Sequence, residues 1–132
     1  MNTTGLMSFD PTEAWEKLRS KSIGRLAVSA GGQPGIFPVN FLASEHSILI
    51  RTSEGTKTAI MGSNELVAFE ADESSPSEAW SVVVKGIAKR IEEPDAIAEA
   101  ADSPLWTWAP KATSVYFRIL PTEITGRYFH RH

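Results

Sequence analysis

The chain contains no cysteine and no long apolar run, and both absences narrow what it can be. Without cysteine there is no disulfide, thiolate nucleophile, iron–sulfur cluster or cysteine zinc site. No stretch approaches the roughly 20 apolar residues of a membrane span, and residues 1–10 lack the basic start and apolar core of a signal peptide. We therefore expect no membrane partner, a cytoplasmic location and a fold held together by packing alone.

Positive charge is also scarce. The formal net charge is −3, and no run of Lys or Arg follows one face of the chain. A nucleic-acid partner is not expected, because binding to nucleic acid requires a basic surface. Two of the 3 histidines, His130 and His132, lie at the end of the chain, where a frayed terminus is a simpler interpretation than a metal site. No Gly-x-Ser-x-Gly motif is present, so we predict no hydrolase and no metal, and we assign no catalytic side chain.

The composition is typical of one globular domain over residues 1–132. Apolar residues make up 42% and charged residues 22% of the chain, which is enough apolar surface for a real core. A first helix is predicted over residues 10–21, because Asp10 can cap it and Pro11 suits its first turn. Its apolar side chains would dock it on the body of the domain.

Short segments rich in β-branched and aromatic residues alternate with turn signals along the rest of the chain. We predict a barrel core over residues 23–91, a helix over 94–102 and two last strands over 114–129 that are broken at Pro121. Because Pro38 cannot donate a ladder hydrogen bond, its segment should lie at a sheet edge or beside a bulge. The pattern predicts a mainly β fold: a closed or nearly closed antiparallel barrel with a few short peripheral α-helices.

One stretch carries the clearest chemical signal. The apolar run 48–50 ends at Arg51, which offers a planar fork of donors, and Lys57 adds a point charge beyond a turn at Gly55. A short helix predicted over residues 56–62 would direct its first amides and its dipole toward the same place. Hydroxyl groups are supplied by Thr52, Ser53, Thr56 and Thr58. This pattern predicts a phosphate site, and the alternative is a solvated turn with ordinary surface cations.

Three other residues have more than one interpretation. The longest connection, residues 92–112, contains Trp106 and Trp108, which can lid one end of the barrel, face a ligand or partner, or do both. Arg127 can pair with Glu123 or another carboxylate, or it can contact a ligand. The sequence alone leaves these roles open.

The order of several motifs resembles that of pyridoxamine 5′-phosphate oxidase-like flavin-binding split-barrel proteins. The similarity covers roughly residues 23–91, with a weaker match at 126–129. It rests on Gly24-Arg25-Leu26-Ala27, Pro38-Val39-Asn40-Phe41, Ile50-Arg51-Thr52 with Gly55 and Lys57, Phe69-Glu70-Ala71-Asp72, and Trp80-Ser81-Val82-Val83-Val84-Lys85-Gly86. The resemblance implies an antiparallel split β-barrel of the FMN-binding type, which forms a homodimer with FMN in clefts at the subunit interface.

The resemblance also assigns roles to individual positions. Arg51, Thr52 and Lys57 would hold the FMN phosphate with help from neighbouring hydroxyls. The flavin ring would lie along residues 38–40, and residues 80–81 would approach it from the opposing strand or from the other subunit. The complete set of predicted cofactor residues is Pro38, Val39, Asn40, Arg51, Thr52, Ser53, Thr56, Lys57, Thr58, Trp80 and Ser81.

The chain also departs from the true oxidases of this family. They are longer, and the Arg and His that clamp their substrate phosphate have no recognisable counterpart around Arg127. We therefore do not expect oxidation of pyridoxamine 5′-phosphate. Two classes of function remain: an FMN-dependent oxidoreductase acting on a small organic substrate, or a non-enzymatic module that binds a flavin, a deazaflavin coenzyme or haem. A deazaflavin coenzyme stays an alternative to FMN because both present a phosphate and a tricyclic ring.

Overall fold

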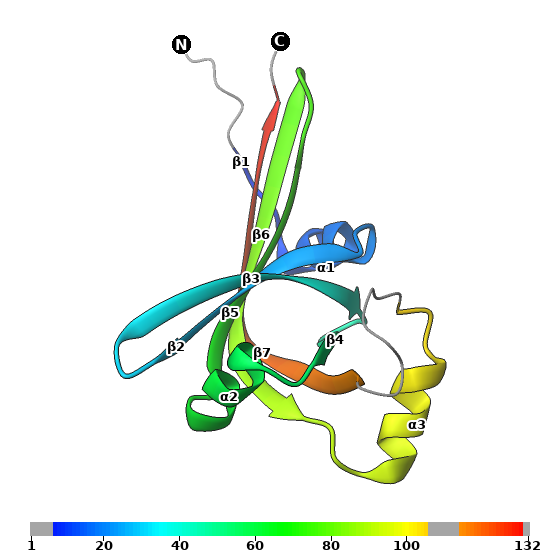
Figure 1. Cartoon of the computed structure of the whole chain (residues 1–132). Coiled ribbons are helices and arrows are strands. Elements are labelled where there is room, and N and C mark those ends of the chain that lie inside the picture. Colours follow the sequence, from blue (N-terminus) through cyan, green and yellow to red (C-terminus); the bar gives the residue numbers. More distant parts are fainter. Residues whose placement is uncertain (1–6, 106–113, 131–132) are drawn as a thin grey trace.

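The computed structural model describes residues 7–105 and 114–130, which form one antiparallel β-barrel with helices at its periphery (Figure 1). The strands are β1 (Met7–Ser8), β2 (Ile23–Ala30), β3 (Gln33–Ala43), β4 (Ile48–Ser53), β5 (Leu66–Ser74), β6 (Glu78–Arg90) and β7 (Ser114–His130). The helices are α1 (Pro11–Arg19), α2 (Thr56–Ser63) and α3 (Pro94–Asp102). None of these described helices is long and apolar enough to cross a membrane.

The sheet closes on itself through β7. The strand order is β1-β7-β4-β3-β2-β5-β6, and β7 pairs with β6 as well, which completes the ring. All pairings are antiparallel. The contact between β2 and β5 is short, because only residues 25–27 pair with residues 68–70. The predicted mainly β split barrel is therefore confirmed.

Beyond the ring, parts of β1, β5, β6 and β7 continue as an arm, which is seen above the barrel in Figure 1. We define the arm as β1 together with the paired ends of β5, β6 and β7, residues 72–82 and 126–130. Helix α1 lies against the base of the arm, where the Nζ of Lys17 is 5.9 Å from the ring centroid of Trp80. The arm extends the sheet well outside the barrel core.

Two prolines mark irregular points of the sheet. Strand β3 pairs with β2 from Gln33 to Asn40 but with β4 only from Asn40 onward, so Pro38 lies on an open edge as predicted. The predicted break at Pro121 is wrong, because β7 runs through it as a single strand. A β-bulge between Lys85 and Gly86 shifts the register there and accommodates the missing proline amide.

The main core fills the barrel. Its largest fully buried side chains include Phe41 and Phe69, whose rings meet edge to face with centroids 4.7 Å apart. Helix α1 begins with the predicted cap, in which Asp10 and Glu13 form a reciprocal capping box, and it ends at Arg19 rather than at residue 21. A second, smaller cluster lies under α3, whose bounds match the prediction, and it consists of Leu49, Ala100, Leu105 and Tyr116.

Candidate functional site

A cavity of about 420 Å³ lies between the open edge of β3, the end of β4 and the start of α2. Residues 37–40 and 51–57 line it. The cross-strand pairing of Asn40 with Arg51 brings these two segments together, and the buried run 48–50 anchors β4 in the core. We call this cavity the β3–β4 cleft. It contains most of the predicted cofactor residues, namely Pro38, Val39, Asn40, Arg51, Thr52, Ser53, Thr56 and Lys57.

Arg51 is held from two sides. Its Nε donates a hydrogen bond to Oγ of Ser114 at 2.9 Å, and its Nη1 lies 3.5 Å from the carbonyl oxygen of Leu105. The guanidinium carbon is 5.8 Å from the ring centroid of Tyr116, its cross-strand partner on β7. Because the side chain is braced by neutral groups, its positive charge stays available to an anion.

The second cation of the cleft is similarly free of acidic partners. The Nζ of Lys57 lies 5.2 Å from the ring centroid of Phe37, an aromatic neighbour that the sequence did not suggest. Among the residues that the structure describes, no carboxylate forms an ion pair with Arg51 or Lys57. The first turn of α2 adds backbone amides without helical partners at the same place. The cleft can therefore bind an anion.

Two buried polar side chains in the cleft also lack partners. Asn40 is 8% exposed and Thr52 is 6% exposed, and within the described part of the chain neither side chain makes a hydrogen bond. Among the described residues, the buried side-chain polar atom without a partner is Oη of Tyr116, so the polar atoms of Asn40 and Thr52 reach the surface of the cleft. Both side chains are open to a hydrogen bond from water or from a ligand.

Thr58 is placed differently from the other hydroxyl residues of this stretch. Its Oγ1 accepts a hydrogen bond from the amide of Gly55 at 2.9 Å and donates one to the carbonyl of Gly55 at 2.8 Å. Thr58, in the first turn of α2, thus bonds back to the N-cap residue Gly55 and lies outside the lining of the β3–β4 cleft. Its predicted contact with a phosphate has no support in this geometry.

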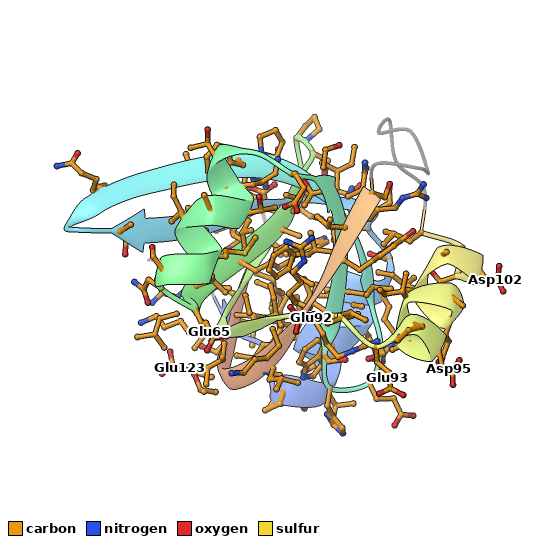
Figure 2. The ribbon with its side chains drawn as sticks, turned by 60° about the horizontal axis from the view of Figure 1, so that its bottom comes forward. Glu65, Glu92, Glu93, Asp95, Asp102 and Glu123 are labelled. Carbon is orange, nitrogen blue, oxygen red and sulfur yellow. The ribbon has the colours of Figure 1, made fainter. Side chains whose placement is uncertain are left out.

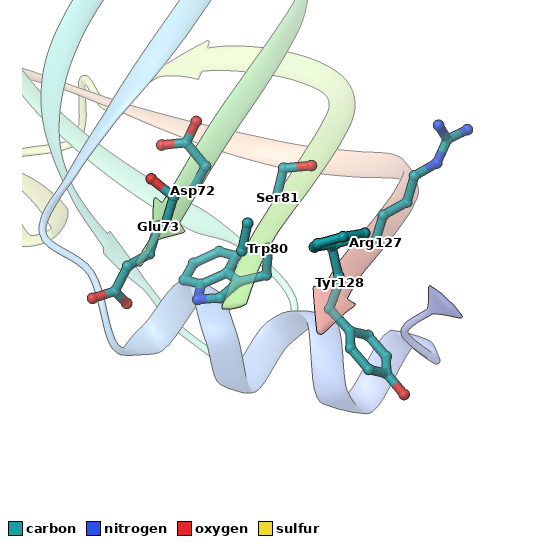
Figure 3. A pocket seen from close by; sticks show the side chains of 9 residues that line it. Asp72, Glu73, Trp80, Ser81, Arg127 and Tyr128 are labelled. Carbon is teal, nitrogen blue, oxygen red and sulfur yellow. The ribbon is translucent and has the colours of Figure 1, made fainter. Parts of the chain in front are cut away.

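Trp80 and Ser81 lie in another cavity, of about 350 Å³, on the arm. Figure 3 shows Trp80 and Tyr128 on the side of α1, whereas Ser81 and Arg127 point to the opposite side. No ion pair links Arg127 to Glu123 or to any other carboxylate within residues 7–105 and 114–130. A single chain therefore does not bring residues 80–81 into the cleft that holds the other predicted cofactor residues.

An ion-pair cluster lies on the sheet between these two cavities. Arg25 donates to Glu70 at 2.6 Å and to Asp72 at 2.6 Å, across the short β2–β5 contact. Burial raises the pKa of Glu70 above its ordinary value despite this bond. Burial also opposes ionisation of Asp72, but its interactions with Glu70 and Arg25 outweigh burial and lower the pKa of Asp72. The sequence does not indicate this cluster, because nothing in it places Arg25 opposite these carboxylates.

Trp106 and Trp108 lie outside the described residues, and so does His132. Among the residues that are described, no group of His, Asp and Glu is arranged to hold a metal ion.

Known proteins are similar to this chain in both sequence and fold. The family model described as pyridoxamine 5′-phosphate oxidase matches residues 10–128. An uncharacterised protein of Mycobacterium tuberculosis, Rv0080, is 30% identical over 128 residues, covering 92% of this chain and 84% of the relative.

Three similar solved structures support the same family assignment. A Corynebacterium glutamicum protein provisionally assigned as a pyridoxamine 5′-phosphate oxidase is 43% identical, with a TM-score of 0.87 over 95% of this chain and 98% of the other. The FAD-binding protein of Mycobacterium smegmatis is 36% identical, with a TM-score of 0.77 over 98% and 99% of the two chains. A FAD-binding protein of Mesorhizobium loti is 26% identical, with a TM-score of 0.84 over 94% and 98%. The chain therefore belongs to the pyridoxamine 5′-phosphate oxidase family.

Proposed function

We propose that the β3–β4 cleft binds a flavin nucleotide, FMN in the first instance, with its phosphate between Arg51 and Lys57. The observation that carries this proposal is the combination of unused groups in the cleft. Within the described residues, Asn40 and Thr52 line the cleft without a side-chain hydrogen bond, and both cations lack carboxylate counter-ions. A phosphate with a polar ring system would satisfy all four groups.

The ring would lie along the open edge of β3. Residues 37–39 are paired with β2 on one side only, so their backbone groups on the other side remain available. Pro38 has no amide hydrogen, so at this residue the strand can offer a carbonyl acceptor but no N–H donor. A planar ring with a polar rim can bind along such an edge. Val39 and Phe37 add apolar surface that excludes water from the ring.

We further propose that the protein is a homodimer in which the arm of one subunit covers the cleft of the other. Within one chain the predicted cofactor residues divide between the β3–β4 cleft and the arm cavity. Cross-strand pairs run from Pro38 through Arg25 to Glu70, so one continuous outward row of the sheet leads from the cleft toward the arm. A second copy placed on this row would bring residues 80–81 to the flavin and would bury surface that is exposed in the monomer.

A bound flavin supplies hydride transfer to or from a small organic substrate. On this basis we propose a flavin-dependent oxidoreductase, with the protein providing binding, orientation and exclusion of water. The second candidate is a non-enzymatic flavin-binding module. It is favoured by two similar solved structures that are named for the FAD they bind and not for a reaction.

The test begins with the absorption spectrum of the purified protein, followed by titration with FMN, FAD, a deazaflavin coenzyme and haem. Flavin binding is expected, with FMN or FAD binding more tightly than the other ligands. Reduction by a nicotinamide nucleotide and recovery of the colour in air would support the oxidoreductase, whereas a bound flavin that resists reduction supports the binding module. A protein that binds none of these ligands would overturn the proposal.

A further inference from the structure

The β3–β4 cleft contains one carboxylate among its cations. Glu54 lies in the turn between β4 and α2 and lines the cleft together with Arg51 and Lys57. It is the only acidic residue among the described residues of the lining. A free carboxylate at this place would repel a bound phosphate and would offset the attraction of one of the two cations.

A distant residue neutralises this carboxylate. Arg90, the last residue of β6, donates from Nη2 to Oε2 of Glu54 at 2.8 Å and from Nη1 to Oε1 at 3.1 Å. The two parallel bonds fix the planes of both groups, which a lysine could not do. The hydrogen bond from Arg90 lowers the pKa of Glu54 below its ordinary value, as expected for a carboxylate paired with a guanidinium.

We infer that Arg90 is a positioning residue of the phosphate site: it holds Glu54 in a bidentate ion pair and so keeps the cleft attractive to an anion. The inference rests on the proposed flavin site and adds to it a residue that does not line the cleft. Arg90 is 36 positions away from Glu54 in the sequence, and the closure of β6 onto β7 brings the two together.

The surroundings of Arg90 make this assignment specific. Figure 2 shows Glu65 and Glu92 on the same side of the barrel, with α2 and α3 flanking them. Glu92 acts on Arg90 only through its charge, and Glu65 is paired with Lys89 at 2.9 Å. Arg90 therefore pairs with Glu54 although other carboxylates lie nearby.

Three variants separate charge neutralisation from simple support of the turn. Arg90→Ala exposes the charge of Glu54, Glu54→Gln removes that charge, and the double variant removes the charges of both residues. Lys89→Ala is the matched control, because it removes a neighbouring cation and breaks an exposed ion pair outside the cleft. Each protein is titrated with FMN and with riboflavin, which lacks the phosphate, at low and at high salt.

The direction of each change in FMN affinity distinguishes charge neutralisation from support of the turn. Arg90→Ala should weaken FMN binding by about threefold to tenfold at low salt, with a smaller effect at high salt and little effect on riboflavin. Glu54→Gln should bind FMN as well as the wild type or better, and the double variant should return to within about twofold of the wild type. Lys89→Ala should bind FMN like the wild type.

Other results would overturn the inference. If Glu54→Gln weakens FMN binding as much as Arg90→Ala does, the ion pair merely supports the turn. If the double variant stays as weak as Arg90→Ala, Arg90 attracts the phosphate directly. If Arg90→Ala binds FMN normally, the assignment fails while the flavin site stands, and failure of the wild type to bind any flavin would instead overturn the proposed function.

Discussion

Ser114 accepts a hydrogen bond from Nε of Arg51 at 2.9 Å, and this bond joins the first residue of β7 to the end of β4. The bond leaves the terminal nitrogens of the guanidinium directed elsewhere, one of them toward the carbonyl of Leu105 at 3.5 Å. The long β7 strand therefore sets the position of the cation on which the proposed flavin site depends.

The first prediction concerns this cation. Arg51→Ala should weaken FMN binding by about tenfold to a hundredfold, because a hydrogen bond to a charged group contributes about 1.5–3 kcal/mol. Ser114→Ala should have a smaller effect in the same direction, and Ser114→Thr should restore affinity because it keeps the hydroxyl. The control is Arg118→Ala, since Arg118 donates to Ser47 and does not line the cleft. Wild-type affinity in Arg51→Ala would remove Arg51 from the site.

The second prediction uses the unpartnered amide of Asn40. Asn40→Leu keeps the branched shape of the side chain and removes an amide that makes no hydrogen bond within the described residues. The ligand-free variant should melt at the same temperature as the wild type or a few degrees higher, while its affinity for FMN falls by about fivefold to tenfold. Calorimetry and fluorescence titration measure the two effects.

Thr52→Val provides an independent check of the same reasoning, because it replaces a buried hydroxyl by a methyl group of equal size. A large loss of stability in both ligand-free variants would show that these side chains serve the fold rather than a ligand.

The third prediction concerns assembly. Light scattering should report about twice the chain mass of 14.4 kDa. Ser81→Lys places a long cation beside Arg127 on the outward side of the arm, so it should weaken dimerisation and flavin binding together. Ser63→Lys, at an exposed position on α2, is the control. A wild-type monomer that binds flavin tightly at micromolar concentration would contradict the shared cleft.

The open edge of β3 and the start of α2 could be predicted from the sequence because local chemistry decides both. A proline without an amide marks an unpaired side of a strand, and a glycine between a strand and a polar helix marks a turn. Most residues that the family resemblance singled out meet in one cleft for the same reason, since residues 38–40 and 51–57 are two continuous segments.

Relationships across the barrel could not be predicted. The ion pair between Arg90 and Glu54 depends on how far β6 extends along β7, and that register is shifted by a bulge opposite Pro121. A shift of one residue in the strand register moves each side chain to the opposite face of the sheet. Because the sequence does not reveal the bulge, it does not predict which side chains meet across these strands. The separation of Trp80 and Ser81 from the β3–β4 cleft depends on the three-dimensional path of β6, which a sequence motif does not contain.

The fourth prediction is a pH dependence of stability at Arg25. A carboxyl whose pKa is raised by folding binds its proton more tightly in the folded state, so Glu70 adds stability in acid that is lost as the pH rises through its folded pKa. Arg25 offsets that loss at neutral pH through its bonds to Glu70 and Asp72.

Arg25→Gln should therefore lower the free energy of unfolding by about 1 kcal/mol at neutral pH, a modest value because the groups are partly exposed. The difference from the wild type should shrink as the pH falls and the two carboxyls take up protons. Denaturant unfolding at several pH values measures it, with Arg118→Gln as the control because Arg118 bonds to a hydroxyl. A difference that does not change with pH would show that Arg25 acts through packing alone.

The last prediction is that the protein oxidises pyridoxamine 5′-phosphate poorly or not at all. A substrate phosphate needs its own set of charge-assisted donors besides those committed to the flavin. In the part of the chain that the structure describes, the cations paired with carboxylates are Lys21, Arg25, Lys89 and Arg90. Among the described residues that line the arm cavity, Arg127 is the single cation, and Asp72 and Glu73 add negative charge. One arginine beside two carboxylates is a poor site for a dianion, so we expect a smaller, less charged substrate. Formation of pyridoxal 5′-phosphate at about 10 per second, the typical turnover of an enzyme on its own substrate, would contradict this interpretation of the arm cavity.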